Sequence, residues 1–190
     1  MEPGTVKPRS KNPHPSFSAY HPGMSDQNAA VPMAPDGEER FAAITKALRS
    51  RLDELVNAPP VRRGIGAPIP KVPGVYLFTK DGVATYVGQT RNLRQRLAQH
   101  AGATSRENQA SFAFNLAKKE ALEAGIDVDR RRRELAADPD FSDRFAKARK
   151  RVAAMDIRFI ELDDPELRTV FEVYAAVMLG TGEHNKFETH

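Results

Sequence analysis

The chain has 190 residues, 40% of them hydrophobic, which is enough to form the core of one domain with appendages. A mean hydropathy of −0.55 without a long apolar run excludes a membrane-spanning helix, and the absence of cysteine excludes disulfides and cysteine-ligated metal sites. The net charge of +4 is uneven, since residues 61–105 carry seven basic and one acidic side chain and residues 152–190 carry three basic and eight acidic ones.

This charge pattern suits a surface that holds a polyanion close to carboxylates, with solvated surface charge as the alternative. The first 37 residues contain seven prolines and few aliphatic side chains, so we expect a disordered tail over 1–37. Residues 38–60 follow as an N-terminal amphipathic helix that ends at two prolines. Its apolar positions have helical spacing: Phe41, Ile44, Leu48, Leu52 and Leu55.

Residues 61–73 are rich in proline and glycine and are predicted to form a linker. From Gly74 the hydrophobic pattern has a period of two, and residues 74–79 and 83–88 are predicted strands of a hairpin. Thr90 is the expected cap of the next helix, whose buried side consists of Leu93 and Leu97.

Residues 105–154 are charged and rich in alanine, and they predict a helical insertion with helices near 111–124 and 141–154. A third strand is expected over 157–162. Asp164, Pro165 and Glu166 then begin a helix that ends near Gly180. The fold class is therefore α/β of the α+β type, with a small, mainly antiparallel three-stranded sheet flanked by helices.

The length of the hairpin loop decides which face of the sheet each tyrosine occupies. A two-residue loop of Asp81 and Gly82 places Tyr76 and Tyr86 on opposite faces. A three-residue loop that adds Lys80, with Gly82 left-handed, places the two tyrosines directly opposite each other. We favour this second register because its alternation is cleaner: Tyr76, Tyr86, Phe78 and Ala84 share one face, and Val75, Leu77, Val83 and Val87 share the other. Cross-strand packing is the alternative role for such a tyrosine pair.

The hairpin and its helix carry a motif. Gly74-Val75-Tyr76, a spacing of ten residues to Tyr86, then Tyr86-Val87-Gly88 and the run QTRNLRQRLAQH resemble the signature of the GIY-YIG nuclease family. The likeness is closest in style to the nuclease domain of bacterial nucleotide-excision repair. The likeness extends over roughly residues 72–190, and it predicts a nuclease domain over 74–190 with a helical insertion at about 105–154. Valine replaces isoleucine in the first motif.

The resemblance implies a metal-dependent endonuclease acting on DNA, and it implies one set of site residues: Tyr76, Tyr86, Arg96, His100, Glu172 and Asn185. In this set Tyr76 is the general base, its pKa lowered by the metal ion, by Arg96 and by a hydrogen bond to His100 or Tyr86. Arg96 binds the scissile phosphate. Glu172 holds one Mg²⁺ or Mn²⁺ ion, and Asn185 orients Glu172 or the loop that carries it. Independently of the family, Arg96 and His100 are four residues apart and so share a helix face.

Further arginines are candidates for contacts to the DNA backbone: Arg91, Arg94, Arg62 and Arg63. The run Arg130–Arg133 is either a backbone-contact patch or a solvated helix face. His184 and His190, with Glu183 and Glu188, have a spacing that fits no standard metal site.

Two other functions compete with the nuclease: a non-catalytic nucleic-acid-binding module that retains the fold, and a protein whose basic face binds something other than nucleic acid. RNA as the substrate and a homodimer both stay open. Because the N-terminus has no apolar segment typical of a secretory signal, we expect a cytoplasmic protein without a membrane partner.

Overall fold

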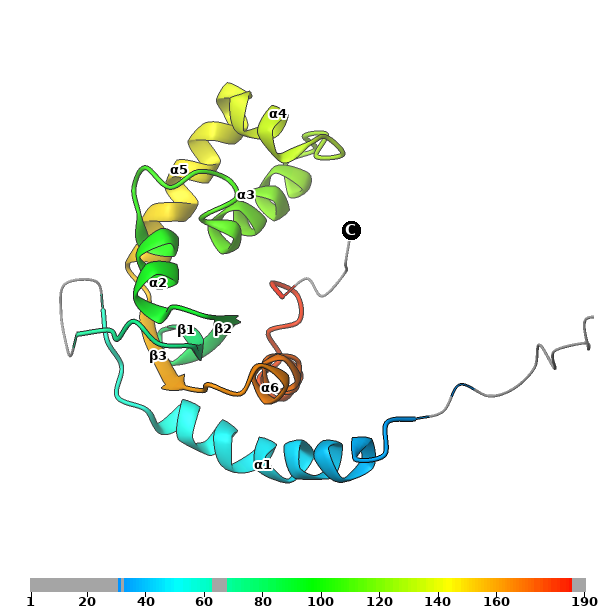
Figure 1. Ribbon diagram of the computed structural model, residues 1–190. Coiled ribbons are helices and arrows are strands. Elements are labelled where there is room, and N and C mark those ends of the chain that lie inside the picture. Colours follow the sequence, from blue (N-terminus) through cyan, green and yellow to red (C-terminus); the bar gives the residue numbers. More distant parts are fainter. Residues whose placement is uncertain (1–30, 32, 63–67, 186–190) are drawn as a thin grey trace, which may run out of the picture. The chain divides into compact units, whose positions relative to one another are not determined.

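The computed structural model describes residues 31, 33–62 and 68–185, and the predicted tail over 1–37 lies largely outside them. Residues 36–190 form one compact unit, separate from residues 1–35. The elements of this unit, in chain order, are α1 (Gly37–Asn57), β1 (Gly74–Lys80), β2 (Val83–Thr90), α2 (Leu93–Ala101), α3 (Ser111–Glu123), α4 (Arg132–Ala137), α5 (Pro139–Ala153), β3 (Asp156–Glu161) and α6 (Pro165–Met178) (Figure 1).

The three strands form one sheet in the order β2-β1-β3, and both pairings are antiparallel. The predicted α+β fold class is therefore confirmed. β1 lies in the centre and is buried along nearly its whole length. β2 is an edge strand, so one side of its backbone is free to bond to other parts of the chain.

Each face of the sheet packs against its own group of helices. Tyr76 and Phe78 of β1 face a core formed with α2, α3 and α5, which lie together in Figure 1. Val75 and Leu77 face the opposite way, onto α1 and α6. The period-two alternation of β1 thus divides the apolar residues between two cores.

The N-terminal helix α1 packs through the C-terminal part of its apolar stripe. Leu48, Leu52 and Leu55 are buried, and Ile44 is partly buried. Phe41, predicted to belong to the same face, is 59% exposed. It lies in the first turns of α1, on the N-terminal side of the part of the stripe that is buried.

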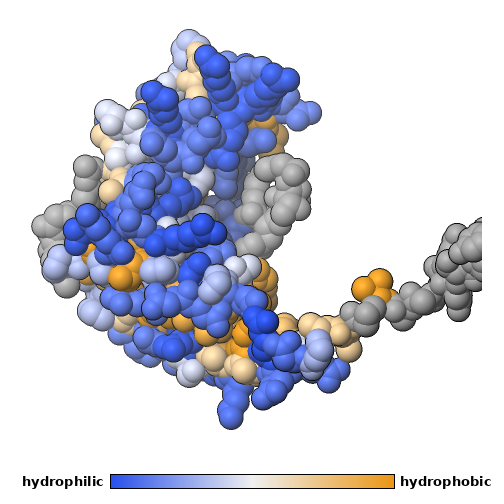
Figure 2. Space-filling view, viewed as in Figure 1, coloured by the Kyte–Doolittle hydropathy of each residue, from blue (hydrophilic) through white to orange (hydrophobic). Residues whose placement is uncertain are grey.

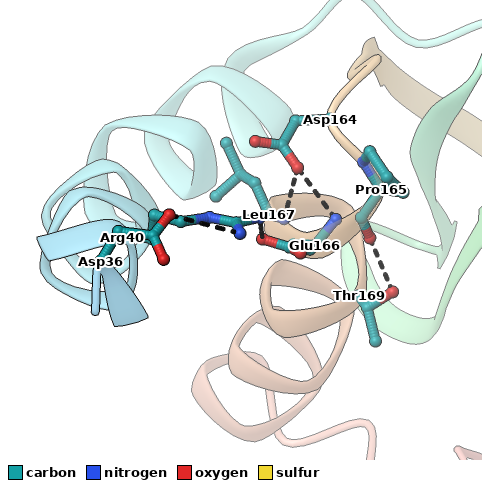
Figure 3. A network of polar contacts seen from close by, with 7 residues as sticks. All are labelled: Asp36, Arg40, Asp164, Pro165, Glu166, Leu167 and Thr169. Atoms are coloured by element: carbon teal, nitrogen blue, oxygen red, sulfur yellow. Dashed lines mark hydrogen bonds and ion pairs between the residues drawn. The ribbon is translucent and has the colours of Figure 1, made fainter. Parts of the chain in front are cut away.

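The beginning of α6 is fixed by a cap and by an ion pair with α1 (Figure 3). The Asp164 carboxylate accepts hydrogen bonds from the backbone N–H groups of Glu166 and Leu167, and Pro165 is the first helical residue, as predicted. Arg40 of α1 donates to Glu166 at 2.6 Å. These contacts fix the start of the helix that carries Glu172.

The hairpin turn differs from the favoured prediction. Lys80 pairs with Val83, so the loop has two residues, and both Asp81 (φ 51°) and Gly82 (φ 79°) have positive φ, as in a type I′ turn. The register shifts between Phe78 and Thr79, leaving Thr85 as an extra residue on β2.

This bulge brings both tyrosines to one face despite the two-residue loop, with Tyr76 opposite Gly88 and Phe78 opposite Tyr86. The shared face was predicted correctly, but the direct pairing of Tyr76 with Tyr86 was wrong. Two other placements were also wrong: Val83 is 68% exposed, and Ala84 packs with the α1 and α6 core.

Because Gly82 has φ 79° and open space around it, only backbone strain opposes a side chain there. We expect Gly82→Val to destabilise the fold by about 1–2 kcal/mol. Gly82→Asn tolerates positive φ and should retain most of the stability. Thermal unfolding of both variants beside wild type measures this difference, and equal melting temperatures for Val and Asn would contradict the turn assignment.

The helical insertion contains the two predicted helices, α3 and α5, and one that was not predicted, α4, with six residues. Six residues form fewer than two helical turns, which is too short for a helical spacing of apolar residues to be recognised. The predicted cap of α2 was also wrong. The side chain of Asn92, rather than that of Thr90, accepts a hydrogen bond from the backbone N–H of Gln95. Among the described residues, no helix combines the length and the apolar character needed to cross a membrane.

Candidate active site

Tyr76 is the centre of a polar cluster on the face of the sheet that packs against α2. Its side chain is 1% exposed, and its hydroxyl lies 2.9 Å from Nε2 of His100 and 3.3 Å from Nε of Arg96. A Cβ atom on Gly88, opposite Tyr76, would lie 2.4 Å from both Cζ and Oη of the phenol. The phenol therefore rests directly on the backbone of Gly88, where only glycine leaves room.

His100 is fully buried behind this phenol. Burial, and then the charge of Arg96, lower the pKa of His100 to about 3, so its imidazole is neutral near pH 7. Its Nδ1 has no hydrogen-bond partner in the described part of the chain. His100 therefore serves to hold the hydroxyl of Tyr76 rather than to carry a charge.

The buried, neutral His100 makes stability depend on pH. Below pH 6.5 the unfolded chain binds a proton at this histidine whereas the folded chain does not until about pH 3, so stability falls as the pH falls through this window. Between pH 7 and pH 5 the loss from His100 is about 2 kcal/mol. We expect His100→Gln to lose less stability over the same interval, as measured by denaturant unfolding at both pH values. An equal loss in the variant would show that His100 is protonated in the folded protein.

Arg96 connects α2 to the insertion. Besides Tyr76, its guanidinium donates to the carbonyl of Gln109 at 3.0 Å and to the hydroxyl of Ser111 at 2.7 Å. No carboxylate lies within ion-pair distance of Arg96 among the described residues. An arginine held by neutral groups retains its full charge for a phosphate.

Tyr86 lies diagonally from Tyr76, with ring centroids 6.3 Å apart. Its ring stacks on Phe112 of α3 at 4.5 Å and an interplanar angle of 15°. Burial raises the pKa of Tyr86, while Arg96 and a hydrogen bond with Ser111 lower it. The insertion thus supports the second tyrosine as well as the arginine.

Glu172 approaches the cluster from α6, beside β2, and its side chain is half-buried. Burial raises the pKa of Glu172, and hydrogen bonds from Gln89 together with the charge of Arg96 lower it. Gln89 is itself oriented by α6, since its Oε1 accepts from Arg168 at 3.1 Å and its Nε2 donates to Thr169 at 3.3 Å. Arg168 is 5% exposed and also donates to two carbonyls at the end of β3.

The charges of these groups act on one another. Burial raises the pKa of Tyr76 well above its usual value; the nearby Tyr86 and Glu172 raise it further, and only Arg96 lowers it. Burial is the main reason that the pKa is raised, because it favours the neutral hydroxyl. Arg96 lowers the pKa as predicted, and the lowering by a bound metal ion stays a prediction.

The residues present fit a single hard cation. Glu172 offers carboxylate oxygens whose burial disfavours their charge, and no cationic side chain lies within ion-pair distance of them in the described part of the chain. A cation would favour the ionised form. No group of three acidic or histidine ligands occurs among the described residues, and Glu172 is the carboxylate that would hold the cation in this cluster.

Asn185 is brought near Tyr86 but not in the manner expected. Its amide accepts from the N–H of Val87 at 3.2 Å and donates to the carbonyl of Val87 at 2.6 Å, and it also accepts from Thr181. Its described hydrogen bonds do not include Glu172. Asn185 therefore binds the turn that follows α6 to β2, and its expected role, to orient Glu172 or the loop that carries it, stays a prediction.

The four arginines proposed for DNA contacts are in different surroundings. Arg91 is exposed at the start of α2, and Arg94 donates to the carbonyl of Ile69 at 2.7 Å. Arg62 lies near the opposite end of the hairpin, paired with Asp156. Arg63 lies outside the described residues. Arg94 thus lies on the helix that carries Arg96, and Arg91 lies just before its first residue.

Among the described residues, His184 and Glu183 belong to no group of three metal-ligating side chains. His184 packs on the ring of Phe112, and Glu183 is paired with Lys119 of α3. His190 and Glu188 lie outside the described residues.

Sequence reasoning missed the residues that support the site: Gln89, Ser111, Phe112 and Arg168. Gln89 directly follows the motif Tyr86-Val87-Gly88, so it is the one of these four residues that the sequence could most readily have indicated. The others depend on how the insertion and α6 pack, for which no local signal exists.

Comparisons with known proteins agree with this arrangement. A family model described as the GIY-YIG catalytic domain matches residues 72–134, a third of the chain, which confirms the resemblance noted in the sequence. UvrABC system protein C of Deinococcus radiodurans is 53% identical over 32 residues, which cover 17% of this chain and 5% of that protein. UvrABC system protein C of Maricaulis maris is 36% identical over 52 residues, covering 27% and 8%. The chain therefore matches only a small part of these relatives, and no solved structure matches it.

Proposed function

We propose that the segment matching the GIY-YIG catalytic domain, together with the helix that carries Glu172, forms a nuclease site that hydrolyses phosphodiester bonds in DNA. The family match supports a nuclease. Beyond that match, one observation carries the proposal: a buried phenol, an arginine without a carboxylate partner and a half-buried carboxylate, drawn from β1, α2 and α6, lie within electrostatic reach of one another.

Phosphodiester hydrolysis requires a positioned phosphate, an acceptor for the proton of the attacking water and stabilisation of developing charge. Arg96 would bind the scissile phosphate through the N–H groups that its protein partners leave free. Tyr76, as the tyrosinate stabilised by Arg96, would accept the proton of the water. His100 would hold the oxygen of Tyr76 in place, and Tyr86 would line the substrate side of the cluster.

The high pKa of Tyr76 means that its hydroxyl is protonated in the arrangement described. A divalent cation such as Mg²⁺ or Mn²⁺ held by Glu172 would supply positive charge that stabilises the phosphate oxygens and favours the tyrosinate. Gln89, fixed by Arg168, would hold the carboxyl group of Glu172 in position.

DNA is the substrate that we propose, on the basis of the basic segment over residues 61–105, which includes Arg91 before α2 and Arg94 on it. A nucleic-acid-binding module without catalysis remains the alternative. RNA is the alternative substrate, and the cleavage experiment distinguishes it from DNA. A homodimer is the alternative to a monomer.

The test is nicking of supercoiled plasmid DNA by the purified protein in Mg²⁺ or Mn²⁺, with EDTA as the control and a structured RNA as the second substrate. We expect relaxed and linear plasmid only in the presence of the cation. Binding of DNA without nicking in either metal would favour the non-catalytic module, and cleavage of RNA alone would replace the proposed substrate.

A further inference from the structure

The run of four arginines in the insertion does not act as one surface. Arg131 and Arg133 are exposed, and Arg130 is paired with Asp138. Arg132 instead turns inward, half-buried, with its guanidinium carbon 4.2 Å from the centroid of Phe114. Figure 2 shows hydrophilic side chains over most of the insertion in this view.

Arg132 and Arg96 are anchored on the same short loop before α3. Arg96 donates to the carbonyl of Gln109, and Arg132 donates through Nη2 to the carbonyl of Glu107 at 3.0 Å. The two guanidinium groups are therefore held on carbonyls two residues apart. Their charges repel: burial lowers the pKa of Arg132, Glu107 opposes this effect, and the charge of Arg96 lowers the pKa further.

Arg132 has few protein partners for its charge. Only one of its five N–H groups has an acceptor among the described residues, and its buried Nε has none. No carboxylate lies within ion-pair distance of it in that part of the chain. Two neighbouring arginines that lack carboxylate partners are stabilised when an anion binds between or beside them.

We propose that Arg132 forms a second phosphate subsite beside Arg96, which binds the phosphate adjacent to the scissile one in the same nucleic-acid strand. This inference rests on the proposed function, because it takes Arg96 as the residue that binds the scissile phosphate. The insertion then contributes directly to substrate binding, and Arg132 fixes the register of the strand in the site.

The experiment compares Arg132→Met with Arg133→Met. Methionine retains an apolar contact with Phe114 but removes the charge, and Arg133 is an exposed neighbour on the same helix. Binding of a fluorescent DNA duplex is measured without divalent cation at several salt concentrations. We expect Arg132→Met to raise Kd about ten-fold and to reduce the salt slope by about 0.9, and Arg133→Met to have a much smaller effect on Kd. Arg132→Lys, which retains charge without the planar fork, should fall between them.

Cleavage kinetics provide the second readout. In Mg²⁺, Arg132→Met should raise KM about ten-fold with little change in kcat, because a flanking phosphate contact is made equally in the ground and transition states. Equal Kd values and salt slopes for Arg132→Met and wild type would overturn the subsite even if the protein cleaves DNA. A wild-type protein that binds DNA without cleaving it would overturn the nuclease proposal instead, with the binding data still deciding the subsite. Absence of any binding by wild type would overturn both. Thermal unfolding of each variant separates these results from a loss of fold.

Discussion

Glu172→Gln is expected to lower the rate of plasmid nicking in Mg²⁺ by about 10³-fold or more while leaving the fold intact. Glutamine has nearly the same shape and can still bond to Gln89, but it lacks the charge that a hard cation requires. DNA binding without divalent cation should stay the same or tighten, because the variant removes a negative charge next to a polyanion.

Glu161→Gln is the matched control for this result. Glu161 is an exposed carboxylate at the end of β3, and its replacement changes the net charge by the same amount. We expect its nicking rate to stay near that of wild type. Nicking by Glu172→Gln at a rate close to that of Glu161→Gln would remove Glu172 from the proposed metal site.

Gly88→Ala is expected to lower the cleavage rate by about 10²-fold, through a single added methyl group. The new Cβ would lie 2.4 Å from Cζ and Oη of Tyr76, so the phenol has to move. Its ring is enclosed by Phe78 and His100, and the displacement separates the hydroxyl from its partners. Misplacing a reacting group by about 1 Å is enough for an effect of this size.

Two controls make the Gly88 result specific. Gly182→Ala adds the same methyl group where no atom lies within 4 Å, and it should have little effect. Combining Gly88→Ala with Tyr76→Phe should be strongly non-additive, because both changes act on the same hydroxyl. Additive effects, or full activity of Gly88→Ala, would show that Gly88 is not needed to leave room for the phenol of Tyr76.

The sequence predicts part of the site well because the information is local. Helical spacing puts Arg96 and His100 on one face of α2, and the structure places both on the hydroxyl of Tyr76. Asp164 and Pro165 specify the start of α6 through backbone chemistry that involves only neighbouring residues. The folded structure retains these features because no contact with a distant segment competes with them.

The hairpin register could not be read in this way. An Asp-Gly pair suits loops of two and three residues, and the bulge at Thr85 compensates for the shorter loop. Whether an extra residue is accommodated on β2 depends on packing of Tyr86 against Phe112 from the insertion. The alternation of apolar residues alone therefore predicted a loop of the wrong length, although it correctly placed Tyr76 and Tyr86 on one face of the sheet.

The inward orientation of Arg132 and the role of Asn185 were also inaccessible. Arg132 differs from the exposed Arg131 and Arg133 through its contacts with the carbonyl of Glu107 and the ring of Phe114. Asn185 pairs with Val87, 98 residues away in the chain. Contacts over such separations follow from the tertiary structure and have no sequence periodicity.

The bonds from Arg96 to Gln109 and Ser111 have a consequence for local stability. Gln109 and Ser111, which hold two of the guanidinium nitrogens, belong to the insertion, whereas Tyr76 and Tyr86 belong to the sheet. Partial opening of α3 would release the guanidinium while β1 and β2 remain paired, so the catalytic geometry is only as durable as the least stable segment that contacts it. We therefore expect Arg96 to lose its orientation at the temperature at which the insertion begins to open. This temperature cannot exceed the melting temperature of the whole domain.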